Sequence, residues 1–217
     1  MPITQVLQQP QRGLRHCIQE FRFSIAFVKI RFMAEITQQI ILVTGPARSG
    51  KSEWAEQLAL QSGKTVCYVA TAQENPDDRE WQARIDQHRS RRPDTWQTLS
   101  VPIELAAAIE AATDAECLLI DSLGTWLANL LEQDETQWNQ TLDRLLQSLE
   151  NAASQIILVA EETGWGVVPA YPIGRTFRDR LGTLTRRIGG IANPVYLVTG
   201  GYVLDLSRLG TPLKNNF

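Results

Sequence analysis

The sequence predicts an α/β protein in which a mostly parallel sheet carries helices on both faces. Three observations lead to this fold class. Short runs rich in valine, isoleucine and leucine recur at residues 40–45, 65–71, 116–121 and 155–162. Stretches with helical spacing separate these runs, and a glycine-rich phosphate-binding motif follows the first of them. Strands that are apolar throughout are typical of a parallel sheet buried on both faces.

Helices are expected between these strands, and several of them end at clear signals. A helix over residues 52–63 ends at Gly63, and Pro93 stops a second helix over residues 79–92. A glycine- and proline-rich loop is expected over residues 163–175, as a mobile segment that faces the substrate. Further helices are expected at residues 103–113, 122–133, 136–153 and 175–192, and further strands at residues 96–99, 194–201 and 202–207.

Composition narrows the function classes. The chain has 217 residues, 43% of them hydrophobic, with a formal net charge of -3 and a pI near 5.5. This acidic balance argues against a nucleic-acid binder, and no apolar run reaches the length that spans a bilayer. The three cysteines show no CxxC spacing, so we expect a reducing, cytoplasmic compartment. Cys67 and Cys117 are expected to act as small core hydrophobes.

The first 32 residues differ from the rest of the chain. They hold five basic residues and one acid, a composition similar to that of a transit peptide. Met33, however, opens a run that leads directly into the first expected strand. We therefore expect residues 1–32 to be a poorly ordered extension or a misassigned start, and residues 33–217 to form a single domain.

The segment "GPARSGKS" fits the P-loop pattern G-x-x-x-x-G-K-S, with a strand before it and a helix after it. Its glycines let backbone N–H groups converge on phosphate oxygens, and the following helix turns its positive end to the same anion. Lys51 is expected to reach the β- and γ-phosphates, and the Ser52 hydroxyl to hold Mg²⁺. A nucleoside triphosphate, ATP or GTP, is therefore expected against the residues of this loop: Gly45, Pro46, Ala47, Arg48, Ser49, Gly50, Lys51 and Ser52.

A carboxylate is needed to complete the Mg²⁺ shell. Asp121 ends the apolar run of residues 116–121, where a P-loop protein places that acid. The alternative is that Asp121 caps the helix that follows it. Glu162, at the end of the run of residues 155–162, is the weaker second candidate and is expected near the nucleotide. Both acids are also candidates for the general base of a kinase reaction.

His88 lies in the strongly basic segment "RIDQHRSRRP". If residues 79–92 form a helix, Arg84, His88, Arg91 and Arg92 share one face. Nearby positive charge keeps imidazole neutral and nucleophilic, and the arginines would hold phosphates. This face would then support a nucleotide phosphate carried on His88. Acids also lie nearby, however, and a helix of mixed charge is more often a solvated surface.

Six segments follow one another in the order and spacing of a known family, over about residues 39–206. They are "LVTGPARSGKSEWAE", "YVATAQ", "RIDQHRSRRPDTWQT", "IDSLGTWLANLL", "ETGWGVVP" and "FRDRLG". The chain resembles the bifunctional adenosylcobinamide kinase / adenosylcobinamide-phosphate guanylyltransferase of cobalamin biosynthesis. The resemblance implies a RecA-like P-loop fold and a homotrimer.

The resemblance also implies two reactions. A nucleoside triphosphate phosphorylates the aminopropanol hydroxyl of adenosylcobinamide, and GTP then transfers GMP to that phosphate with release of pyrophosphate. The histidine that carries GMP in the family matches His88. One competing hypothesis is another P-loop small-molecule kinase in which His88 is inert. The other is a nucleotide-dependent regulatory or nucleic-acid-linked protein on a RecA-like core, against which the acidic pI argues.

The sequence departs from the family pattern at several positions. Pro46 stands where a second glycine is usual, which fixes one φ angle and removes one N–H donor. Thr185 and Arg186 stand where an Asn-Gln pair is common. The P-loop Lys51 and Ser52 and the histidine are unchanged, so both half-reactions are expected to survive while handling of the corrinoid differs.

Overall fold

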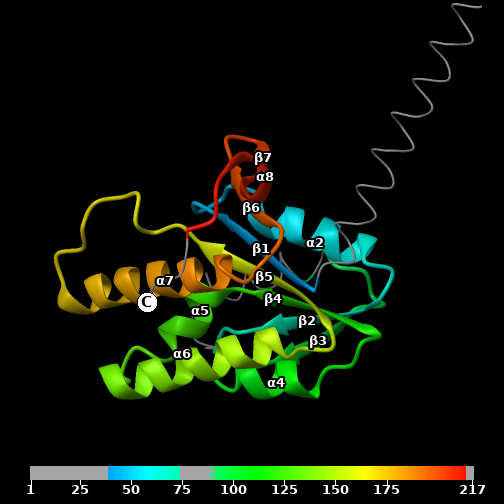
Figure 1. Cartoon of the computed structure of the whole chain (residues 1–217), viewed down its shortest axis with the longest axis horizontal. Helices are drawn as coiled ribbons and strands as arrows, with labels where there is room; N and C mark the ends of the chain where they lie inside the picture. The colour runs from blue at the N-terminus through cyan, green and yellow to red at the C-terminus, as the bar shows by residue number, and fades with distance from the viewer. Residues whose placement is uncertain (1–38, 74–88, 90, 214–217) are drawn as a thin grey trace, which may run out of the picture. The chain divides into compact units, whose positions relative to one another are not determined.

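A seven-stranded sheet forms the centre of the chain in the computed structural model, which describes residues 39–73, 89 and 91–213. The strand order is β3-β2-β4-β5-β1-β6-β7 (Figure 1). In chain order the strands are β1 (Ile40–Gly45), β2 (Thr65–Ala70), β3 (Gln97–Ser100), β4 (Glu116–Asp121), β5 (Gln155–Glu161), β6 (Val195–Thr199) and β7 (Tyr202–Asp205). The helices are α2 (Lys51–Gln61), α4 (Leu105–Ala111), α5 (Leu123–Ala128), α6 (Glu135–Glu150), α7 (Pro172–Gly189) and α8 (Leu206–Leu209).

The sheet is parallel except at one edge, where β6 and β7 form an antiparallel hairpin. Parallel pairing aligns the carboxyl ends of β1, β5, β4 and β2 along one edge. β5 lies between β1 and β4, so the strand that precedes the P-loop and the strand that ends in Asp121 are not neighbours. The predicted α/β fold class is confirmed.

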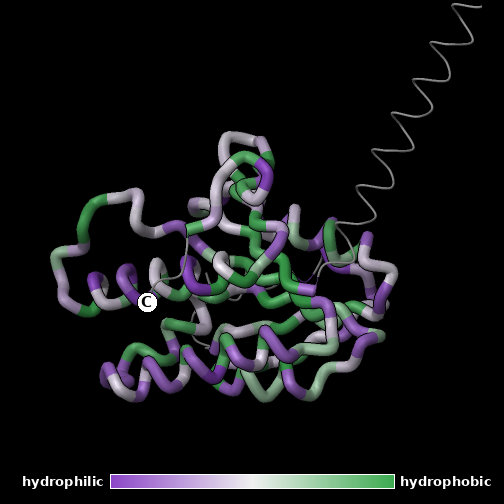
Figure 2. Tube along the Cα trace, in the orientation of Figure 1, coloured by the Kyte–Doolittle hydropathy of each residue, from purple (hydrophilic) through white to green (hydrophobic). Residues whose placement is uncertain are grey.

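Alternate residues of each central strand are buried on opposite faces of the sheet. On one face Ile41 and Val43 of β1 pack with Ala55 and Leu58 of α2. On the other face the strands pack against α4, α5, α6 and α7, with Trp126 almost fully buried among them. Figure 2 shows the hydrophobic strands in the middle and hydrophilic residues along the helices that cover them. Burial on both faces explains why the strands are apolar throughout.

Most expected elements are present, with shifted boundaries. α7 begins at Pro172, three residues before the expected start, because proline is well suited to the first turn of a helix. The short helix α8 was not expected. Most of the helix expected over residues 79–92 lies outside the described residues.

The contacts of the chain divide it between Thr37 and Gln38, and the first unit lies outside the described residues. Cys67 and Cys117 are both buried free thiols, as expected. Across the described part of the chain, no helix combines the length and the apolar character needed to cross a membrane.

Candidate functional site

The P-loop connects the end of β1 to the first turn of α2. Gly50 has a φ of 92°, in the left-handed region that glycine adopts without strain, and its carbonyl accepts the N–H of Trp54. Arg48 also has a positive φ, of 59°. The Ser49 N–H donates to the Pro46 carbonyl across 3.3 Å, so the loop closes on itself. The segment therefore curls as an anion-binding loop requires, with Pro46 accommodated within it.

Lys51 is the first residue of α2 and is only 9% exposed. Its Nζ donates to the Pro46 carbonyl at 3.3 Å, so the side chain folds back over the loop. A buried ammonium is costly unless an anion or a polar group compensates it. This ammonium group is therefore held where phosphates bound by the loop would meet it.

Gly45 is packed so closely that it has no room for a side chain. A Cβ atom there would lie 2.3 Å from the backbone oxygen of Val198 and 2.7 Å from Ser49 Oγ. The first glycine of the motif thus sets the distance between the loop and β6. Ser49 Oγ is buried and has no hydrogen-bond partner among the described residues, so this hydroxyl is available for a ligand.

Two glutamates lie side by side where β5 ends, next to the P-loop. Glu162 accepts a hydrogen bond from Thr44 Oγ1 at 2.7 Å, and its N–H donates to the Gly45 carbonyl at 2.9 Å. Glu161 accepts hydrogen bonds from Ser122 Oγ and from the Gly124 N–H at the start of α5. The structure therefore places Glu162 beside the P-loop strand and gives Glu161 the role of tying β5 to α5.

Asp121 ends β4, two strand spacings from β1, which is about 10 Å. The alternative that Asp121 caps α5 is wrong, because the cap is Ser122 in a capping box with Thr125. Asp121 instead accepts a hydrogen bond from the Tyr68 hydroxyl. Its carboxylate therefore lies on the α2 side of the sheet, because Tyr68 packs in the cluster on that face.

Arg91 and Arg92 bring the basic segment against the P-loop helix and the sheet edge. Arg91 bonds Glu53 Oε1 at 3.0 Å and Glu56 Oε1 at 3.4 Å, both on α2. The Arg92 guanidinium lies 3.1 Å from the centre of the Tyr68 ring, a cation–π contact. Arg91 is therefore fixed to α2, the helix that begins at Lys51, and Arg92 is fixed to Tyr68 of β2.

Burial has the largest effect on the pKa values of Glu56, Tyr68 and Arg92. Loss of water raises the pKa of Glu56, and Arg91 opposes that rise. Burial, and then the charge of Asp121, raises the pKa of Tyr68, which keeps its hydroxyl protonated. Burial lowers the pKa of Arg92, and the charges around Arg92 offset this. Water is partly excluded here, so the attraction of the arginines for a phosphate is strengthened.

The segment between β5 and α7 is exposed. Trp165 is 61% exposed and does not pack into the core. Arg175 donates to the carbonyls of Pro169 and Ala170 at 3.1 and 2.6 Å, which fixes the end of the segment. Arg178 pairs with Asp179 at 3.0 Å.

The structure thus brings together only part of the site predicted from sequence. The P-loop and Glu162 are adjacent, Arg91 bonds the P-loop helix, and Arg92 contacts Tyr68 of β2. His88 and Arg84 lie outside the described residues, and no group of three or more potential metal ligands occurs in the described ranges. Sequence reasoning missed Tyr68 and Glu56. A polar residue within an otherwise apolar strand was the available signal for Tyr68.

A P-loop at the carboxyl edge of a parallel sheet, with cationic and acidic side chains around it, defines a P-loop nucleotide-binding protein. Residues 41–206 match the family model described as cobinamide kinase / cobinamide phosphate guanyltransferase. The chain belongs to this family.

Curated relatives agree with this assignment. The bifunctional adenosylcobalamin biosynthesis protein CobP of Pseudomonas aeruginosa is 42% identical over 174 residues, which cover 79% of this chain and 98% of the relative. The bifunctional adenosylcobalamin biosynthesis proteins CobU of Escherichia coli and Salmonella typhimurium are each 35% identical, over 75% of this chain and 96% of the relative.

Solved structures of lower identity were also matched. The RadB recombinase has a TM-score of 0.40 at 17% identity, with 73% of each chain covered. A prototypical ATPase from a type III secretion system has a TM-score of 0.44 at 10% identity, with 79% of this chain and 53% of that chain covered.

Proposed function

We propose that this protein phosphorylates the aminopropanol hydroxyl of adenosylcobinamide and then transfers GMP from GTP to the resulting phosphate, through a GMP-histidine intermediate on His88. One observation carries the proposal furthest. The two arginines that follow His88 by three and four residues are fixed to α2, which begins at the P-loop, and to Tyr68 of β2. The family assignment supplies the substrate.

In the first reaction the substrate hydroxyl oxygen attacks the γ-phosphorus of the bound nucleotide. The bond from that phosphorus to the bridging oxygen breaks, and the nucleoside diphosphate leaves. Lys51 and the loop N–H groups neutralise the charge that develops on the phosphoryl oxygens. Glu162, held by Thr44 next to the loop, is the carboxylate best placed to accept the hydroxyl proton.

In the second reaction a ring nitrogen of His88 attacks the α-phosphorus of GTP and pyrophosphate leaves. An oxygen of the substrate phosphate then attacks the same phosphorus, and the phosphorus–nitrogen bond breaks. Covalent catalysis divides a transfer between two anions into two easier steps. Arg84, Arg91 and Arg92 supply the positive charge that both steps need.

Magnesium accompanies the nucleotide in this proposal. Ser52 and Asp121 provide hydroxyl and carboxylate oxygens, the donor types that Mg²⁺ prefers, and we assign the ion to them. When bound, Mg²⁺ neutralises phosphate charge. Residues 33–217 are proposed as the catalytic domain.

A homotrimer is the proposed assembly. Apolar side chains on the hairpin of β6 and β7 and just beyond it support an interface, because Tyr202, Leu209 and Leu213 are 75%, 71% and 76% exposed.

The test follows the two phosphates separately. Adenosylcobinamide is incubated with a nucleoside triphosphate labelled in its γ-phosphate. Adenosylcobinamide phosphate is incubated separately with GTP labelled in its α-phosphate. We expect a labelled phosphate ester in the first reaction and a labelled GDP ester in the second, and neither with Lys51→Ala. Absence of both products from a folded wild-type protein that hydrolyses or binds nucleotide would overturn the proposal. Labelling in the first reaction alone would favour a simple kinase with an inert His88.

A further inference from the structure

A small pocket lies between the end of β5 and the middle of α7. Its volume is about 220 Å³, and its walls include Glu161, Glu162, Thr163, Arg178, Thr185 and Arg186. Drug-sized ligands occupy pockets of roughly 300–1,000 Å³, so this one is suited to a small polar group. It is too small for a corrin macrocycle and large enough for the phosphate-bearing end of a flexible arm.

The pocket shares a wall with the nucleotide site. Glu162 lines it and is bonded through its side chain to Thr44 and through its N–H to the Gly45 carbonyl. Thr44 and Gly45 are the last two residues of β1, and Gly45 is also the first residue of the loop that is expected to hold the triphosphate. A group bound in the pocket therefore lies next to the phosphates of a nucleotide in the P-loop.

The α7 wall carries the groups that a phosphate monoester needs. Arg178 and Arg186 both line the pocket, and a guanidinium binds phosphate through two parallel hydrogen bonds. Arg178 also pairs with Asp179, whose side chain is 66% exposed, and such pairs contribute little free energy. Binding a phosphate can therefore replace that pair at low cost.

Thr185 provides a second observation that points to a ligand. Its Oγ1 atom is buried, yet it has no hydrogen-bond partner within the described ranges. A buried hydroxyl without a partner costs roughly 1–3 kcal/mol, so such groups usually meet a ligand or water. Its position in the wall of the pocket, between the two arginines along α7, makes a bound polar group the natural partner.

We propose that this pocket binds the phosphate of the phosphorylated aminopropanol arm, with Arg178, Arg186 and Thr185 as its ligands. The macrocycle stays outside, and the phosphate is positioned for its attack on the guanylyl group. This assignment rests on the proposed function for the identity of the ligand. The pocket, its two arginines and its unpartnered hydroxyl do not depend on that function.

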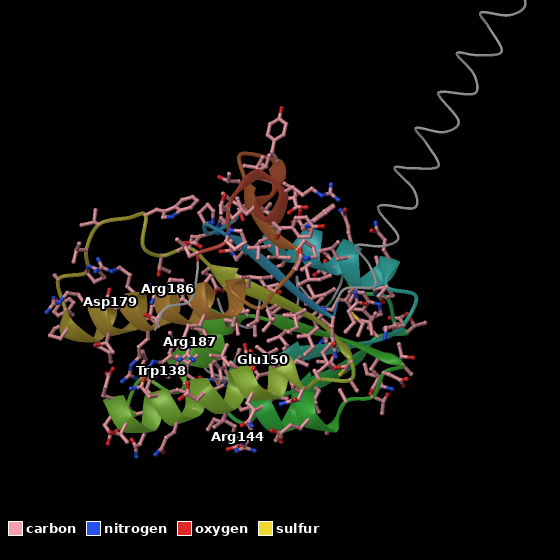
Figure 3. All side chains as sticks on the ribbon, in the orientation of Figure 1. Trp138, Arg144, Glu150, Asp179, Arg186 and Arg187 are labelled. Atoms are coloured by element: carbon pink, nitrogen blue, oxygen red, sulfur yellow. The ribbon has the colours of Figure 1, made fainter. Side chains whose placement is uncertain are left out.

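The chain offers a matched control on the same helix. Arg187 follows Arg186, but it bonds Asp143 of α6 at 3.0 Å and does not line the pocket. Figure 3 shows Arg187 on the side of α7 that faces α6. Arg187→Gln therefore removes the same charge from α7 without touching the pocket.

The direct test uses the arm alone. Isothermal titration with 1-amino-2-propanol O-phosphate is done with GDP at saturation, so that the P-loop is occupied. We expect saturable binding with a Kd of roughly 1 mM or below, weakened at least tenfold by Arg178→Gln or Arg186→Gln. Arg187→Gln should bind as the wild type does, and unphosphorylated 1-amino-2-propanol should not bind.

Two results would contradict the assignment of this pocket as a phosphate site. Absence of saturable binding to the wild type, or equal weakening by all three arginine variants, removes the pocket as a phosphate site. Thermal unfolding of each variant shows that it is folded before it is titrated.

Kinetics separate this assignment from the proposed function. With cobinamide phosphate and saturating GTP, Arg186→Gln should raise the KM for cobinamide phosphate at least tenfold and leave the KM for GTP within about twofold. If wild type makes no guanylylated product but the arm still binds through both arginines, the proposed function fails and the phosphate site stands. If Arg178→Gln and Arg186→Gln both form the guanylylated product with an unchanged KM for cobinamide phosphate, the phosphate site fails and the proposed function stands.

Discussion

Replacing Gly45 with alanine should destabilise the fold by about 2–3 kcal/mol. The added Cβ would lie 2.3 Å from the Val198 oxygen, about 1 Å inside ordinary contact distance. Its second close neighbour, Ser49 Oγ, is the end of a short side chain and is free to rotate. The Val198 oxygen belongs to the backbone of β6, so relief requires β1 and β6 to separate. Overpacking that moves backbone typically costs 1–3 kcal/mol, and we expect the upper part of that range.

Urea unfolding monitored by tryptophan fluorescence measures this cost. With a slope of roughly 2–3 kcal/mol/M for a domain of this size, the midpoint should fall by about 1 M. The control is Gly189→Ala in the last turn of α7, where the nearest atom, Leu42 Cδ2, lies at an ordinary 3.7 Å. That change should stabilise by up to about 1 kcal/mol, because alanine favours helix. A midpoint for Gly45→Ala within 0.2 M of wild type, as a rough bound on measurement error, would refute the steric reasoning.

Three further predictions concern the packing around the site. Asn129→Asp should destabilise the protein by about 2 kcal/mol or more in urea unfolding, because Nδ2 donates to two backbone carbonyls at 2.8 and 2.9 Å that a carboxylate would face instead. A loss of stability no larger than that caused by Asn129→Ala would argue against this reasoning. A double-mutant cycle of Arg92→Ala and Tyr68→Leu should give a coupling energy of about 1 kcal/mol, and additivity would show that the cation–π contact contributes nothing. Burial raises the pKa of Cys117 to about 11, so only about 0.1% is thiolate at pH 8. Cys67 is buried as well, and burial raises its pKa. In a Cys17→Ser variant no thiol should therefore react with Ellman's reagent at pH 8 until the protein unfolds, and rapid reaction of the folded protein would contradict the burial.

The sequence predicted those features that depend on neighbouring residues. The P-loop is such a case, because Gly50 and Lys51 act within one eight-residue segment, whereas the packing of Gly45 against Val198 is not encoded locally. The buried strands were equally clear, since burial on both faces leaves only apolar residues. The end of α2 was close to the expected position, near Gly63.

Features that depend on residues far apart in the chain could not be read in this way. β5 lies between β1 and β4, so the strand that ends in Asp121 is not a neighbour of the P-loop strand, and no local pattern encodes this strand order. Ser122 rather than Asp121 caps α5, and Glu161 from another strand holds that serine in place. The contact of Arg92 with Tyr68 likewise joins separate segments.

The start of α7 could not be predicted from composition, for a different reason. Pro172 and Gly174 lie in a stretch that favours a loop by composition, yet the helix already includes both. Proline disrupts a helix interior but is well accommodated in the first turn, so composition alone gives the wrong boundary.

The most direct test of the central claim is covalent labelling of the protein by GTP labelled in its α-phosphate. The chain has only two histidines, so His16→Ala is a matched control for His88→Ala. Wild type and His16→Ala should carry a protein-bound label that is stable to base and lost in acid, and His88→Ala should carry none. A label that persists in His88→Ala, or guanylylated product formed at the wild-type rate by that variant, would contradict the account.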